Sequence, residues 1–212
     1  MIRRCLLISL LICVGLILKS CTSYTALYNV GLSKVEAPTD IKEKYGETKV
    51  TKFTDSKDNT IKYQYKDDYI DIVWYVGIKQ FNFSLTNISQ HPIKINWDEI
   101  TYVDQNSNVK RTMHAGVKYT ERNNSQPSST IPKGAKINDL LLPTDNVYFV
   151  SGQYGGWKET ALFPVYYSSK QDLQTKAPLL VGTNVRILFP ISIEGVTNDY
   201  TFEFEIMDLL NK

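Results

Sequence analysis

The C-terminal part of the chain alternates between apolar and polar residues over two consecutive stretches. Every odd-numbered residue is apolar in 185–193, and every even-numbered residue is apolar in 200–206. Because the side chains of a β-strand point alternately to its two faces, each stretch has one apolar face. The intervening residues 194–198 (EGVTN) include the turn formers glycine and asparagine. The pattern predicts two antiparallel strands that cover a core and are joined by a turn over 194–198.

Strand-forming residues continue through the rest of the chain from Glu47 onward. Shorter alternating stretches occupy 81–86 and 93–97, and polar turn clusters occupy 57–59, 66–68 and 104–108. Short strands separated by such turns are typical of a sandwich or barrel. Pro190 lies inside a predicted strand, where it indicates an edge or a bulge because proline has no N–H to donate. No segment after residue 20 has a long helical period, so we predict an all-β, antiparallel fold.

One segment adds a resemblance to this reading. The pattern F-x-F-x-L-x-N-x-S-x-x-P-I-x-I across 81–95 resembles a strand-turn-strand step of bacterial immunoglobulin-like accessory domains. The resemblance implies an immunoglobulin-like β-sandwich over 47–212. A plain domain of that kind has about 100 residues. We therefore expect the surplus length in two loop-rich insertions, at 112–136 and 151–182.

The first 20 residues differ in composition from the rest of the chain. A basic start with Arg3 and Arg4 precedes the uncharged apolar run 5–18, which is 14 residues long. This arrangement is typical of a secretory signal, whose helical apolar part spans roughly 7–15 residues. A membrane-spanning helix needs about 20 apolar residues. The sequence therefore predicts a cleaved signal peptide rather than a permanent anchor.

The end of this segment resembles the lipobox of bacterial lipoproteins. Leu18-Lys19-Ser20-Cys21 has the aliphatic residue and the cysteine of that motif, although Lys19 stands where a small or apolar residue is usual. Looser boxes that end in Ser-Cys are similar to those of Bacteroidetes-type lipoproteins. The resemblance implies a diacylglyceryl group on Cys21, cleavage before Cys21, and anchoring by fatty acyl chains such as palmitate. Because Cys5 and Cys13 leave with the signal, Cys21 is the single remaining cysteine and no internal disulfide can form.

These features predict three parts: a signal peptide at 1–20, a tether at 21–46 and a β-sandwich domain at 47–212. In the lipoprotein family an aspartate after the cysteine often signals retention in the inner membrane. Thr22 and Ser23 stand there instead. An acidic run that marks surface-exposed lipoproteins is also missing. The resemblance therefore implies a cell-envelope protein on the outer membrane, with its domain on the periplasmic side.

The charge balance excludes one class of partner. The chain has 24 basic and 22 acidic residues, and removal of Arg3, Arg4 and Lys19 leaves 21 basic against 22 acidic. A near-neutral domain lacks the positive surface that nucleic-acid binding requires. We therefore expect no nucleic-acid partner.

Chemical motifs are sparse. His91 and His114 are 23 positions apart and have no metal-ligand spacing. The G-x-S-x-G elbow of hydrolases does not occur. Asp98 and Glu99 are adjacent, so on a strand they would point to opposite faces. We expect no metal, no other cofactor and no catalytic activity, and keep as an alternative a hydrolase that pairs His114 with a carboxylate.

Aromatic residues are the strongest candidates for binding. The chain has 14 tyrosines and 3 tryptophans, and Tyr154, Trp157, Tyr166 and Tyr167 fall in the second insertion. Exposed rings stack on sugars or anchor protein partners, whereas buried rings would close the end of the sandwich. Two binding hypotheses follow: an accessory subunit with an exposed apolar patch that docks on an envelope protein, and a glycan-binding module with coplanar rings.

Overall fold

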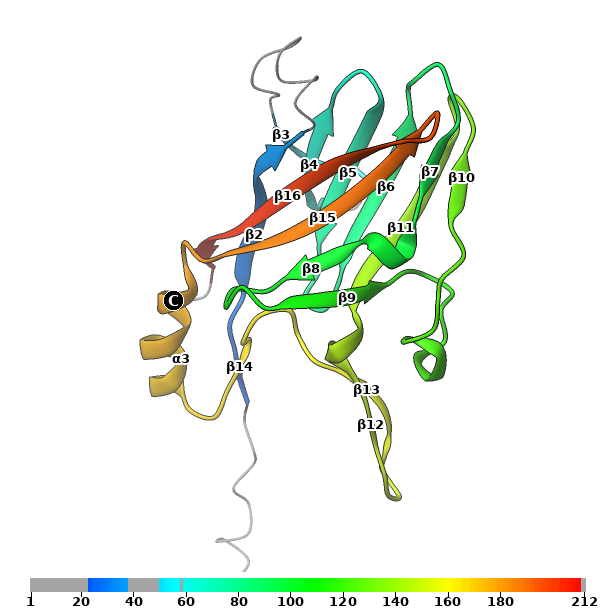
Figure 1. Ribbon diagram of the computed structural model, residues 1–212. Helices are drawn as coiled ribbons and strands as arrows, with labels where there is room; N and C mark the ends of the chain where they lie inside the picture. The colour runs from blue at the N-terminus through cyan, green and yellow to red at the C-terminus, as the bar shows by residue number, and fades with distance from the viewer. Residues whose placement is uncertain (1–22, 38–49, 58, 211–212) are drawn as a thin grey trace, which may run out of the picture.

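The computed structural model describes residues 23–37, 50–57 and 59–210, and these residues form mostly β-structure (Figure 1). The strands are β1 (Tyr24–Thr25), β2 (Tyr28–Glu36), β3 (Thr51–Thr54), β4 (Ile61–Lys66), β5 (Ile70–Val76), β6 (Phe81–Asn87), β7 (Ile93–Ile95), β8 (Thr101–Val103), β9 (Val109–Met113), β10 (Ser129–Ile131), β11 (Lys136–Pro143), β12 (Val147–Val150), β13 (Gly156–Glu159), β14 (Tyr166–Tyr167), β15 (Asn184–Ile193) and β16 (Val196–Leu209). The helical segments are α3 (Lys170–Lys176) and the 3-10 turns η1 (Trp97–Glu99), η2 (Tyr119–Glu121), η3 (Thr144–Asn146) and η4 (Ala177–Leu180). The signal peptide 1–20 and Cys21 lie outside the described residues.

The strands form two layers that face each other. One layer runs β3-β4-β5-β6-β11, and the other contains β2-β16-β15, with β7-β10 and β8-β9 beside β15. All these pairings are antiparallel, and the end of β11 also pairs with β9, so the two layers are continuous. The predicted all-β antiparallel sandwich is confirmed.

Large aromatic side chains fill the space between the layers. Trp74 on β5 is fully buried, and its ring centroid lies 5.1 Å from that of Phe202 and 5.3 Å from that of Phe204, both on β16. Phe189 on β15 meets Phe83 on β6 at 5.4 Å. Phe83, Phe189, Phe202 and Phe204 occupy apolar positions of the alternating stretches 81–86, 185–193 and 200–206, as the period of two requires. The alternation therefore predicts the inner faces of β6, β15 and β16 correctly.

Pro190 lies neither on an edge strand nor at a bulge as predicted, because β15 is a central strand, but the pairing on one side of β15 is interrupted there. β8 pairs with β15 as far as Leu188, and β7 pairs with it from Ile191 onward. The 3-10 turn η1 joins β7 to β8 opposite this gap. Because proline cannot donate a ladder hydrogen bond, it fits where one neighbouring strand is broken.

The turn between β15 and β16 is tighter than expected. Ile193 pairs directly with Val196, so only Glu194 and Gly195 form the turn, and residues 196–198 belong to β16. Both turn residues have positive φ, at 51° and 82°. This conformation suits a two-residue hairpin whose twist matches that of its strands, and glycine at the second position favours it. The prediction of a turn over 194–198 was therefore wrong by three residues.

The tether prediction for 21–46 is also wrong for a large part of its length. Residues 28–36 form β2, which pairs with β16 from Thr201 to Leu209, and Leu32 is buried in the core. The pairing contains two register shifts, which break the alternation that would have identified a strand. The folded domain therefore begins at β1, well before Glu47.

Candidate functional site

A two-stranded hairpin projects from the end of the sandwich. We call residues 147–159 the aromatic hairpin. It consists of β12 and β13, which among the described strands pair only with each other, from Val147 opposite Glu159 to Val150 opposite Gly156. Figure 1 shows it extending away from both layers at the lower end of the molecule. An isolated two-stranded hairpin is marginally stable in water, so its base must hold it in place.

Apolar and ionic contacts hold the base. Val147 is buried against Met113 and Leu142. The Glu159 carboxylate accepts a hydrogen bond from the Tyr119 hydroxyl and lies 3.2 Å from the Lys79 ammonium. The Tyr119 hydrogen bond and the Lys79 charge hold the pKa of Glu159 below its ordinary value. The base is therefore fixed to the sandwich while the distal part extends outward.

The distal part exposes apolar side chains on both faces. Tyr154 at the turn is 88% exposed and Phe149 is 60% exposed, and Tyr148 and Val150 are also exposed. The Phe149 ring lies 5.5 Å from that of Trp157, which is half-buried beside the Arg122 guanidinium. Single exposed apolar residues are ordinary, but several on one projecting element mark an interaction surface.

The four aromatic residues predicted from the sequence are not brought together. Tyr154 and Trp157 lie on the aromatic hairpin, whereas Tyr166 and Tyr167 form β14, which pairs with β1. Tyr166 is exposed, but Tyr167 is only 9% exposed. The Tyr167 hydroxyl lies 2.9 Å from that of Tyr28. Adjacent residues of a strand point to opposite faces, so Tyr167 does not present its ring to solvent.

Tyr148, Phe149 and Val150 were missed by the sequence reading. The run VYFV at 147–150 has no polar residue, and such a run is typical of a buried strand. Only Val147 is buried. Nothing in the local sequence distinguishes this exposed strand from a buried one.

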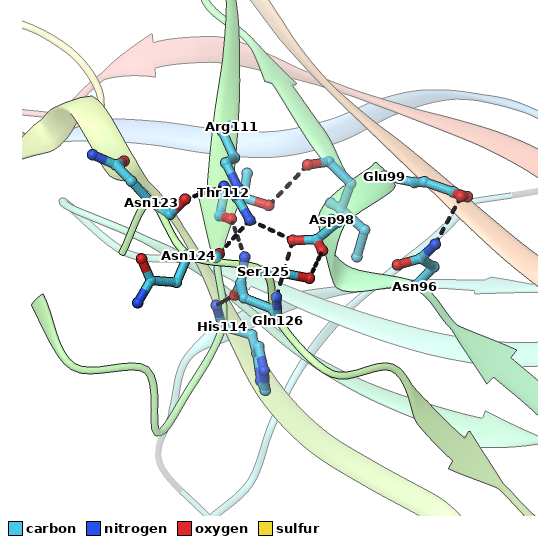
Figure 2. Close-up of polar contacts among 11 residues, drawn as sticks. Asn96, Asp98, Glu99, Arg111, Thr112, His114, Asn123, Asn124, Ser125 and Gln126 are labelled. Atoms are coloured by element: carbon cyan, nitrogen blue, oxygen red, sulfur yellow. Dashed lines mark hydrogen bonds and ion pairs between the residues drawn. The ribbon is translucent and has the colours of Figure 1, made fainter. Parts of the chain in front are cut away.

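The first insertion is held by a polar network (Figure 2). Asp98 on η1 accepts hydrogen bonds from the Arg111 guanidinium, from the Ser125 hydroxyl at 2.5 Å and from the Gln126 N–H at 3.1 Å. The Ser125 hydrogen bond is the main cause that holds the pKa of Asp98 below its ordinary value, with help from Gln126 and Arg111. Arg111 also donates to the backbone carbonyl of Asn123. The Asp98 carboxylate therefore holds the first insertion against η1.

His114 is held between two other residues. Its ring stacks on Trp97, with centroids 4.0 Å apart and an angle of 7° between the planes. Its Nδ1 lies 3.2 Å from the Asp139 carboxylate, which also accepts the Ala115 and Leu140 backbone N–H groups. The alternative hydrolase hypothesis required a histidine beside a carboxylate, and this pair provides one. The same contacts also give His114 a structural role, because they link β11 to the segment that follows β9.

The described residues contain neither a cluster of metal ligands nor a membrane-spanning helix. There, no three histidine, cysteine, aspartate or glutamate side chains are grouped closely enough to hold a metal ion. Over the same part of the chain, no helix has the length and apolar character needed to span a bilayer.

No protein-family model, no curated protein and no solved structure matches this chain. The aromatic hairpin is therefore the strongest candidate site.

Proposed function

We propose that this chain is a Bacteroidetes-type lipoprotein of the cell envelope that acts by binding, as an accessory subunit, and not by catalysis. Acyl chains on Cys21 hold it on the outer membrane, with the periplasmic face favoured. The folded part, which we class with immunoglobulin-like accessory domains, binds through the aromatic hairpin. The basic start, the apolar run 5–18 and the box Leu18–Cys21 support the anchor.

One observation carries the binding role. The aromatic hairpin places Tyr148, Phe149 and Tyr154 in solvent on an element that contributes little to the core. Aromatic side chains are enriched in binding surfaces because each buries a large area when a partner covers it. An exposed apolar patch of this kind is what the accessory-subunit hypothesis requires.

The glycan-binding alternative has less support. A sugar ring stacks flat on aromatic rings, so a platform for several sugars needs rings in one plane. The ring planes of Phe149 and Trp157 form an angle of 68°, and Tyr166 lies on a different element. Tyr154 is a single exposed ring at the hairpin turn. We therefore favour a hairpin that docks through its exposed apolar side chains.

The anchor is tested by the intact mass of the N-terminal peptide from the membrane fraction. We expect a peptide that starts at Cys21 and carries added acyl mass. In a Cys21→Ala variant the acyl mass and the retention in the membrane fraction should both be lost. An unmodified peptide that starts at Met1 would show that residues 1–20 stay attached, and the lipoprotein assignment would be wrong.

A further inference from the structure

We infer that the aromatic hairpin inserts its tip into the interface of the same membrane that holds the acyl chains, and so forms a second attachment point. This inference rests on the proposed function, because it takes Cys21 as the anchor. It assigns the hairpin tip to a bilayer surface, and an envelope protein that covers the same rings is the competing outcome of the test. Four observations lead to it.

The first is the short distance between Cys21 and the folded domain. β1 begins at Tyr24, whose partner is Tyr167 of β14. Three residues of chain span at most about 11 Å. Acyl chains on Cys21 would therefore hold the end of the sandwich that carries β1 directly against the bilayer, without the long tether that the sequence suggested.

The second is that the hairpin leaves the sandwich at this same end. The Ala26 N–H donates to the Val165 carbonyl at 2.8 Å, which ties the segment after β1 to the segment before β14. The Leu162 N–H donates to the Ile78 carbonyl at 2.9 Å, in the turn between β5 and β6. The neighbouring Lys79 in that turn pairs with Glu159 at the hairpin base. Figure 1 shows β14 and the hairpin both on the lower side of the molecule, with the hairpin extending further.

The third is the apolar character of the surface there. Leu27, after β1, is exposed, and the Leu210 N–H donates to its carbonyl at 2.7 Å. Leu179 on η4 is exposed beside the buried Ala177, which packs with Ala26 and Tyr167. Exposed large apolar residues near this end, outside the hairpin, include Leu27, Ile78, Tyr166, Leu179 and Leu210. The hairpin therefore projects from an end of the sandwich that already exposes apolar side chains.

The fourth is the charge of the hairpin. Residues 147–158 include no aspartate or glutamate, and Lys158 is exposed opposite Tyr148. Tyrosine, tryptophan and lysine are the residues that favour the boundary between lipid and water. The carboxylate of Glu159 lies at the base, where it is engaged by Lys79 and Tyr119. The tip can therefore enter the interface without burying an acid.

A short tether also makes a weak contact effective. An element held beside a surface meets it at a high effective concentration, so modest apolar contacts suffice for attachment. Contact through the hairpin would also orient the sandwich, with the turn between β15 and β16 directed away from the membrane. β16 has 14 residues, and at roughly 3.3 Å per residue it extends about 45 Å from that turn toward β1.

A matched pair of tryptophan probes tests this orientation. Tyr154→Trp places an indole at the hairpin tip, and Val196→Trp places one at the turn between β15 and β16, where the native side chain is also exposed. Each full-length acylated variant is purified from membranes. It is then reconstituted in vesicles of phosphatidylethanolamine and phosphatidylglycerol, with or without bromine on the acyl chains. Wild-type emission is subtracted, and far-ultraviolet circular dichroism verifies the fold.

We expect the Tyr154→Trp emission to shift to shorter wavelength and to lose intensity in brominated vesicles, while Val196→Trp keeps its intensity. Equal intensity with and without bromine in both variants would overturn the inference. In that case acrylamide added to native membranes identifies the occupant: a probe at 154 open to this aqueous quencher is free, and a shielded one is covered by protein. The mass of the Cys21 peptide is measured on the same samples, so failure of the anchor is distinguished from failure of the hairpin contact.

Discussion

Tyr102 on β8 is fully buried, yet its hydroxyl has no hydrogen-bond partner among the described residues. Burial is the main cause that raises the pKa of this phenol above its ordinary value, and the nearby Asp104 charge adds to it. Tyr200 on β16 is the opposite case, because its hydroxyl donates to the Asp67 carboxylate at 2.8 Å. The same residue type therefore makes two different contributions to stability.

The substitution Tyr102→Phe removes a buried polar atom that has no partner. We expect the free energy of unfolding to stay the same or to rise by up to about 1 kcal/mol. Tyr200→Phe is the control and should lower it by about 1–2 kcal/mol, because it removes a hydrogen bond to a charged group. Urea denaturation measures both. A loss of stability in Tyr102→Phe equal to that in Tyr200→Phe would mean that the Tyr102 hydroxyl has a partner.

β2 is the element that the sequence least reveals, although it completes one layer of the sandwich. Its glycine explains how it fits there. A Cβ added to Gly31 would lie 2.2 Å from the Tyr63 Oη and 2.3 Å from its Cζ. The Tyr63 ring belongs to β4 in the opposite layer and is buried. Gly31 therefore leaves the space that this ring occupies.

Gly31→Ala should force the Tyr63 ring out of position. We expect a loss of about 1–3 kcal/mol in the free energy of unfolding, the usual cost of overpacking. Ser33→Ala on the same strand is the control, because Ser33 is exposed and its substitution should cost less than about 1 kcal/mol. Thermal unfolding followed by circular dichroism compares the two variants. Equal stability of both would show that β2 can shift away from Tyr63 without cost.

At the scale of the whole molecule, the sandwich and the aromatic hairpin contribute differently to folding. Trp74, Phe189 and Phe202 join the two layers, whereas Tyr148 and Tyr154 face solvent. The free energy of unfolding should therefore depend on the buried rings between the layers and be nearly independent of the two exposed tyrosines. Exposed aromatic residues that do not stabilise the fold are consistent with a role in binding.

The double variant Tyr148→Ser/Tyr154→Ser should change the free energy of unfolding by less than about 1 kcal/mol, because both side chains are at the surface. Phe189→Ala, which empties part of the core, should cost about 3–5 kcal/mol. Denaturant titration of the three proteins gives the comparison. If the double variant were as unstable as Phe189→Ala, the hairpin would be a structural element of the fold and its exposed rings would need another explanation.

The sequence by itself determined the features that depend on neighbouring residues. The period of two in 185–193 and 200–206 predicts β15, β16 and their inward faces, because alternation follows from strand geometry alone. The signal-like first 20 residues and the lipobox are also local patterns, and the anchor on Cys21 stays a prediction. Pro190 belongs here too, because the missing N–H is a property of the residue itself.

Tertiary structure decided which apolar segments are covered. VYFV at 147–150 reads as a buried strand, yet within the described part of the chain only β13 pairs with it, and residues 148–150 stay exposed. Tyr167 reads as a loop residue, yet β1 pairs with β14 and Tyr28 meets its hydroxyl. β2 lacks regular alternation because its register shifts against β16. Burial depends on which distant segments pack across a strand, and that information is absent from the local order of residues.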